Sequence, residues 1–206
     1  MTSHFRLTDL AGLRANHVIA SIASHRGHQA VRLVLAPDAV TPDNPNFAII
    51  EGLDFANGSI EVQLASQVLA EFGPEPRGFI GIAFRISSGL GKFEGVYLRP
   101  KNARETAQIR RNRSVQYFSY PGFKFDRLRK EAPGEYETYV DLELGAWTRL
   151  RIEVEGDKAR VYVHDAVQPT LIVNDLKHGA DARGAIGLFL DRGTEAFFRD
   201  LKVTPK

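Results

Sequence analysis

Short runs with alternating apolar and polar positions dominate the chain, and the period of 3.6 residues that marks amphipathic helices is nearly absent. The runs are rich in Val, Ile, Phe and Tyr and are bounded by Gly, Pro, Asn or Asp, as strands usually are. The strands that we expect cover residues 17–24, 30–36, 48–53, 58–65, 79–86, 93–99, 114–119, 137–142, 147–155, 158–164, 171–175, 185–191 and 196–203. A helical turn at 8–13, a surface loop at 37–45 and a short helix or ordered loop at 102–111 complete the pattern.

Tight turns connect several of these runs. Gly156 and Asp157 separate two alternating runs, which is a strong local signal for an antiparallel hairpin. About a dozen antiparallel strands at spacings of roughly 8–12 residues predict a sandwich or a barrel. Since no repeat of propeller length and no low-complexity linker divides the sequence, we expect a single domain over residues 1–206.

The strand at 79–86 has two faces of different character. One face is apolar and consists of Ile80, Ile82, Phe84 and Ile86. The other face consists of Phe79, Gly81, Ala83 and Arg85. Residues two apart share a face of a strand, so the first set is expected to face the core. A floor of very small residues beside an arginine would admit a ligand close to the backbone.

Applied to the neighbouring strands, the same alternation predicts a groove on this second face. The residues that we expect to bind a ligand there are Arg85, Tyr97, Arg99, Asn112, Gln116, Tyr120 and Phe189, and Asp191 falls on the same face. Aromatic rings beside guanidinium and amide groups suit a saccharide, whose C–H face stacks on a ring while its hydroxyls form hydrogen bonds. Arginine can also pair with the carboxylate of an acidic sugar. The alternative is that Arg85 and Arg99 form ion pairs on an ordinary sheet face.

Composition narrows the function classes. The 206 residues carry a formal net charge of +2, so no field of the whole molecule points to nucleic acid or to a membrane. The absence of cysteine excludes disulfides, thiolate chemistry and cysteine-based zinc sites. The N-terminus lacks the pattern of a secretory signal and the apolar runs are too short to span a bilayer, so we expect a cytoplasmic protein that does not enter a membrane.

The segment RETAQIRRNR at 104–113 is basic and lies between two groove strands. A basic patch of this kind can bind RNA or a phosphate-bearing partner. Aromatic residues do not interleave with it, however, and the net charge is small. We therefore expect a solvated loop that forms a lid at the mouth of the groove.

Several motifs spread over the chain resemble a known superfamily. They are FANGSIEV at 55–62, WTRLRI at 147–152, GAIGL at 184–188 and FRDLKV at 198–203. Together they resemble the concanavalin A-like lectin/glucanase superfamily, including its laminin G-like members. The resemblance implies an all-β fold, an antiparallel two-sheet jelly-roll sandwich that binds ligands on its concave sheet.

Within this superfamily, GIAFR at 81–85 followed by Gln116 is similar to the bacterial 3-keto-disaccharide hydrolase (DUF1080-like) domains. Those domains carry a Glu-x-Gln motif, but here Ser114 stands two residues before Gln116. The resemblance implies a carbohydrate-active domain that binds a glycan or sugar derivative, as a binding module, a glycoside hydrolase or a polysaccharide lyase. The alternative is a non-catalytic laminin G-like interaction module without sugar chemistry.

Two sites remain to be assigned. Glycoside hydrolysis normally needs two carboxylates, and Glu137 and Asp141 are the first pair to test because they share a face of the strand expected at 137–142. The six histidines are scattered, so a zinc site is not expected. The resemblance implies a structural Ca²⁺ held by the carbonyl of Gly58 and by Asp200, with the alternative that Asp200 merely ends a surface turn. No other cofactor is required.

Overall fold

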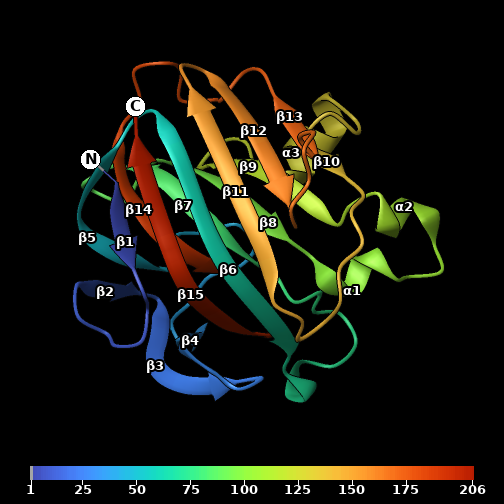
Figure 1. The fold of residues 1–206 in the computed structure, drawn as a ribbon. Coiled ribbons are helices and arrows are strands. Elements are labelled where there is room, and N and C mark those ends of the chain that lie inside the picture. Colours follow the sequence, from blue (N-terminus) through green and yellow to red (C-terminus); the bar gives the residue numbers. More distant parts are fainter. Residues whose placement is uncertain (1) are drawn as a thin grey trace.

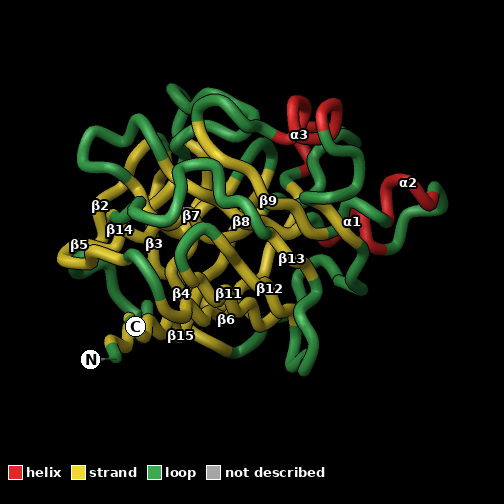
Figure 2. Tube along the Cα trace, turned by 90° about the horizontal axis from the view of Figure 1, so that it is seen from above, coloured by secondary structure: helices red, strands yellow, loops and turns green. Residues whose placement is uncertain are grey.

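The computed structural model describes residues 2–206, whose strands form two antiparallel sheets packed face to face (Figures 1 and 2). The first sheet contains β1 (Ser3–Phe5), β3 (Val18–His25), β4 (His28–Leu35), β6 (Gly58–Val68), β11 (Thr148–Glu155), β12 (Lys158–Val163), β13 (Leu171–Val173) and β15 (Thr194–Pro205). The second contains β2 (Leu13–Asn16), β5 (Phe47–Phe55), β7 (Ile80–Ile86), β8 (Phe93–Leu98), β9 (Val115–Tyr120), β10 (Glu137–Thr138) and β14 (Gly184–Leu190).

Strand order confirms the predicted fold class. The first sheet runs β13-β12-β11-β6-β15-β4-β3, with β1 paired to β15, and the second runs β10-β9-β8-β7-β14-β5-β2. Neighbours in each sheet are mostly distant in sequence, as in a jelly roll, and every pairing is antiparallel. The protein is therefore an antiparallel two-sheet sandwich of the jelly-roll type.

Helices are short and lie in the connections. They are the 3₁₀ turn η1 (Ala70–Phe72) and the helices α1 (Pro100–Ala103), α2 (Gln108–Arg111) and α3 (Phe125–Glu131). Helices α1 and α2 confirm the short helix or ordered loop that was expected at residues 102–111. The helical turn expected at 8–13 is wrong, because this segment forms turns that lead into β2. The strand expected at 137–142 is shortened to β10, and α3 was not expected. No helix among residues 2–206 is both long and apolar enough to cross a membrane.

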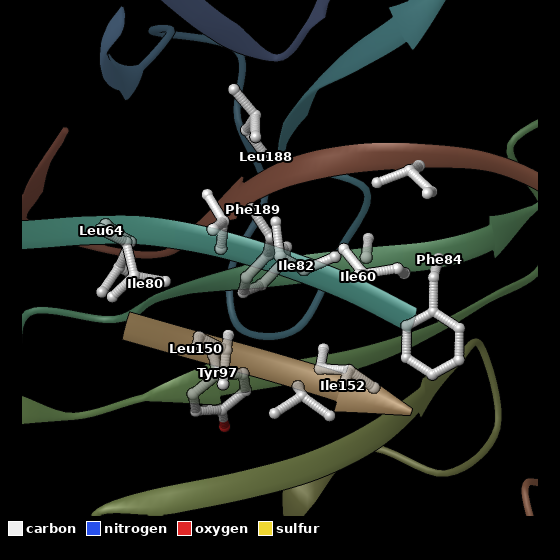
Figure 3. Close-up of a cluster of buried hydrophobic side chains, with 14 of the residues drawn as sticks. Ile60, Leu64, Ile80, Ile82, Phe84, Tyr97, Leu150, Ile152, Leu188 and Phe189 are labelled. Atoms are coloured by element: carbon white, nitrogen blue, oxygen red, sulfur yellow. The ribbon is translucent and has the colours of Figure 1, made fainter. Parts of the chain in front are cut away.

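The core lies between the two sheets and follows the predicted alternation. Ile80, Ile82 and Phe84 of β7 point into it and are fully buried. They join side chains of β6 and β11 from the opposite sheet in one cluster (Figure 3). Burial of each such side chain stabilises the fold by about 1.5–3 kcal/mol, which makes this contact a main source of stability.

The outer face of the second sheet is also covered. The connection between β9 and β10, which contains α3, lies above this sheet together with other loops (Figure 2). Three hydrogen bonds join loop 37–46 to this connection or to Asp191, which directly follows β14: Lys124 Nζ to Pro42 O, Phe125 N to the Asp43 carboxylate, and Asp43 N to the Asp191 carboxylate. Loops therefore cover part of the outer face of the second sheet, which carries the residues of the predicted groove and which we call the concave sheet.

Candidate ligand-binding site

Aromatic rings fill the floor of small residues at the centre of the concave sheet. Gly95 lies opposite Phe118, and a Cβ atom built on Gly95 would stand 2.2 Å from the Phe118 ring. The centroid of this ring lies 5.6 Å from that of Phe93 and 5.2 Å from that of Phe189, and all three rings are fully buried. The prediction that small residues leave this part of the groove open is therefore wrong, since they make room for neighbouring side chains.

Arg85 supports turns elsewhere in the fold. Its backbone has φ = 54°, and the pairing register of β7 with β14 shifts beside it, so its side chain leaves the alternation of the strand. The guanidinium donates to the carbonyls of Ala56, Gly156 and Gly179 at 2.9, 2.8 and 3.0 Å. Burial lowers the pKa of Arg85. The structure does not bring this residue together with the other predicted ligand-binding residues.

Open space remains at one end of the concave sheet, in a hollow of about 480 Å³ that we call the first hollow. Its aromatic residues are Phe79, Tyr97 and Phe125. Its guanidinium groups belong to Arg77, Arg99, Arg110, Arg113, Arg129 and Arg192, and its carboxyl groups to Asp43, Glu75 and Asp191. Loop 37–46 and helix α3 supply one wall and the segment from α2 to β9 supplies another, so the basic segment lies beside the hollow as the sequence predicted.

Three predicted residues form one hydrogen-bonded group at this end of the sheet. Tyr97 of β8 lies directly opposite Gln116 of β9, so both occupy the same face as predicted. Arg99 donates to the Tyr97 hydroxyl at 2.7 Å and to Gln116 Oε1 at 3.2 Å. Tyr97 and Arg99 line the first hollow, while Gln116 is buried behind them and orients Arg99.

Glu137 lies among three arginines. Its carboxylate is 2.6 Å from Arg129, 3.2 Å from Arg113 and 3.7 Å from Arg99. One negative charge thus faces three positive charges, and its side chain is only 9 % exposed. Burial and the nearby charge of Arg129 lower the pKa of Arg113. The cluster retains a surplus of positive charge at the edge of the first hollow.

A second hollow of about 430 Å³ adjoins the first, and the two share Arg113 and Arg129. Asn112, Glu137 and Tyr139 also line the second hollow. The structure therefore gathers two further predicted residues, Asn112 and Glu137, around the same arginine pair. The two hollows lie on either side of this pair.

Asp43 and Asp191 form a buried pair in the wall of the first hollow, 1 % and 2 % exposed. Burial and the negative charge of Asp43 raise the pKa of Asp191 to about 7, and burial also raises the pKa of Asp43. Near neutral pH Asp191 is thus partly protonated. Strand alternation had placed Asp191 on this face, whereas Asp43 was missed because its loop lies far away in sequence. The Pro-Asp-Asn-Pro turn at 42–45 was the available signal.

The remaining predicted residues lie outside the two hollows. Tyr120 stacks on Phe93 with ring centroids 5.2 Å apart, and Phe189 stacks beneath Tyr97 at 5.8 Å. Asp141 is exposed and binds Arg104 at 3.1 Å. Glu137 and Asp141 therefore have different partners, and β10 ends before it reaches Asp141.

Gly58 and Asp200 do not meet in space. Gly58 pairs with Pro205, five residues further along β15 than Asp200, which corresponds to about 16 Å along a strand. The Asp200 carboxylate pairs with Arg199 at 2.9 Å. Within residues 2–206, no group of three or more His, Cys, Asp or Glu side chains is arranged to hold a metal ion.

Comparisons with known proteins support the fold. No family model and no curated protein sequence matches the chain. Solved structures do match: a protein of unknown function with a galectin-like fold from Bacillus subtilis has a TM-score of 0.61 at 13% identity, covering 98% of this chain and 94% of that one. The carbohydrate-binding module CBM66 from Bacillus subtilis has a TM-score of 0.52 at 14% identity, covering 92% and 97%. Domain 4 of the extracellular arabinanase AbnA from Geobacillus stearothermophilus, in complex with arabinotriose, has a TM-score of 0.54 at 11% identity, covering 97% and 89%.

Proposed function

We propose that the protein binds a carbohydrate in the first hollow. The observation that carries the proposal is the meeting of three aromatic rings with guanidinium and carboxyl groups in a hollow of about 480 Å³. This volume lies within the range of small-molecule sites. Phe79 and Phe125 are half-buried and present ring surface on which the C–H face of a sugar can stack.

Polar groups of the hollow match sugar hydroxyls. The guanidinium of Arg99 is already oriented by Tyr97 and Gln116, so little side-chain entropy is lost when it binds a ligand. On the opposite wall, the carboxyl groups of Asp43 and Asp191 can accept hydrogen bonds from the hydroxyl groups of the sugar. A carbohydrate-binding module and an arabinotriose-bound domain of the same fold add support by analogy of fold.

Isothermal titration calorimetry against a panel of neutral and acidic oligosaccharides tests this proposal. Phe79→Ala and Phe125→Ala should each weaken binding by ten-fold or more, since the stacking contact is worth about 1 kcal/mol beyond the buried area. Tyr162→Ala is the matched control, because Tyr162 packs on Arg151 on the outer face of the first sheet. Absence of binding to every saccharide would favour the laminin G-like alternative, an interaction module without sugar chemistry.

One observation favours a second function, the cleavage of a glycosidic bond. Asp43 and Asp191 are two carboxyl groups in one hollow, and the raised pKa of Asp191 leaves a proton available near neutral pH. Glycoside hydrolysis needs a general acid and a second carboxyl group across the scissile bond. Release of reducing ends from a bound oligosaccharide, abolished by Asp191→Asn and by Asp43→Asn, would support it; binding without release would leave the protein a binding module.

A further inference from the structure

We propose that the ligand is an acidic oligosaccharide that spans both hollows and places a carboxylate against Arg113 and Arg129. This inference rests on the proposed function and adds to it the charge and the length of the ligand. Three features support it: the surplus of positive charge, the geometry of the arginines and the two arginines that both hollows share.

The charge surplus is local. Glu137 is shared by Arg99, Arg113 and Arg129, and within residues 2–206 neither Arg110 nor Arg192 forms an ion pair. Asp191 does not offset this surplus fully, since it is partly protonated near pH 7. Repulsion between the arginines in this partly desolvated hollow raises the free energy of the ligand-free protein, and a bound anion removes part of that repulsion.

The arginines also have unused hydrogen-bonding capacity. The Nε atom of Arg113 is buried and has no hydrogen-bond partner, although it lies 3.2 Å from a Glu137 oxygen in poor alignment. A planar guanidinium matches a carboxylate through two parallel N–H···O bonds. Because three arginines share the single negative charge of Glu137 and the whole chain carries only +2, a singly charged acid group fits better than a polyanion.

The length of the ligand follows from the shape of the site. Arg113 and Arg129 line both hollows, so a ligand bound to this arginine pair can reach into each of them. Tyr139 in the second hollow is 39 % exposed, and Arg111 lies over its ring at 5.0 Å and donates to its hydroxyl at 3.0 Å. The ring face that Arg111 does not cover gives the second hollow its own stacking surface. One sugar on each side of the arginine pair would therefore be bound.

The test measures binding of oligogalacturonides, oligoglucuronides and oligomannuronides of one to six residues, each with its methyl ester as the uncharged match. We expect affinity to rise at least ten-fold from one to three residues and to fall at least ten-fold on esterification. Arg113→Gln should lower affinity for the acid at least ten-fold and for the ester less than two-fold. Arg104→Gln is the matched control, since Arg104 is exposed and lies outside both hollows.

Each contrary result overturns a different claim. Equal binding of acid and ester would refute the acidic ligand while leaving the carbohydrate function intact, and no binding to any saccharide, neutral ones included, would refute both. Saturation with a single residue would refute the spanning ligand. If a sulfated oligosaccharide or an oligouridylate binds more tightly than the uronic-acid oligosaccharides, the claim that Arg113 and Arg129 bind a carboxylate would be refuted. Should Arg113→Gln fail to fold, Tyr139→Ala decides, because it should weaken the trimer at least five-fold and the monomer not at all.

Discussion

The main-chain N–H of Asp43 donates a hydrogen bond of 2.7 Å to the carboxyl group of Asp191, across 148 positions of the sequence. The Asp43 carboxylate in turn accepts a bond of 3.0 Å from the N–H of Phe125, the first residue of α3. One residue of loop 37–46 thus connects the end of a concave-sheet strand to the helix above it. The wall of the first hollow depends on this connection.

The first prediction concerns the pH dependence of stability. The pKa of Asp191 is about 7 in the folded protein and 3.8 when unperturbed, so the folded state binds this proton more tightly. This contribution is fully present below about pH 4 and is lost as pH rises to about 7, an effect on the order of 2–4 kcal/mol. The free energy of unfolding should be measured with urea from pH 4 to 9. Relative to Asp191→Asn, wild type should lose stability between about pH 4 and about pH 7 and lose no more between pH 7 and pH 9.

Asp54→Asn is the control for this experiment, because Asp54 is exposed and pairs with Arg183. Its difference from wild type should stay constant from pH 5 to 9. A constant difference for Asp191→Asn as well would contradict the assignment of the buried proton.

The second prediction concerns Arg85. Replacement by Lys leaves one nitrogen to serve three carbonyls from separate turns, so buried acceptors lose partners. We expect the free energy of unfolding to fall by about 2–4 kcal/mol, and saccharide affinity to remain within two-fold of wild type. Arg183→Lys, in an exposed pair, should cost less than about 0.5 kcal/mol. A loss of saccharide affinity without a loss of stability would mean that Arg85 belongs to the ligand-binding site after all.

Much of the fold follows from local alternation, as the case of β7 shows. Ile80, Ile82 and Phe84 are assigned to the core by their spacing alone, and the structure agrees. At the next residue, Arg85, the same rule fails, because a positive φ in a non-glycine residue turns the side chain away. Such a backbone conformation is imposed by tertiary contacts, so no local pattern announces it. Helix α3 was missed for a related reason, because its seven residues are too few to show a helical period.

The third prediction concerns the filled floor of the concave sheet. Gly95→Ala should lower the free energy of unfolding by about 1–3 kcal/mol, since the new methyl group overlaps the Phe118 ring. Phe118→Leu removes that overlap, so the double variant should be more stable than the sum of the single effects predicts. Gly91→Ala, with open space around the site, is the control and should be neutral. Strict additivity would show that the two residues do not share this space.

The fourth prediction separates stability from affinity at Glu137. Glu137→Gln removes the charge that Arg99, Arg113 and Arg129 share, so the free energy of unfolding should fall by about 2–4 kcal/mol. Affinity for an acidic trisaccharide should rise at least five-fold, because the ligand no longer competes with a carboxylate. Glu143→Gln, in the exposed pair with Arg104, should alter neither quantity. A fall in both stability and affinity would mean that Glu137 orients the arginines rather than competing with the ligand.

The candidate site was predictable where strands determine it and not where loops do. Tyr97, Arg99 and Gln116 meet because antiparallel register places them together, and alternation is enough to infer this. The small residue Gly81 was misread, since it indicates free space above the backbone but not whether a ligand or neighbouring rings fill it, and here the stacked rings of Tyr97 and Phe189 flank it. Asp43 could not be placed at all, because its position depends on the packing of a loop across the finished sheet.

The hydrogen bonds of Asp43 to Asp191 and to α3 determine how ordered the site is before it binds a ligand. Bound in this way, the wall of the first hollow is already ordered before any ligand arrives, so its conformational entropy is lost during folding and not during association. Calorimetry should then show a small entropic penalty on binding, and amide protons of Asp43 and Phe125 should exchange equally slowly with and without saccharide. The first hollow would then be a preorganised site, in which shape as well as charge determines which sugars bind.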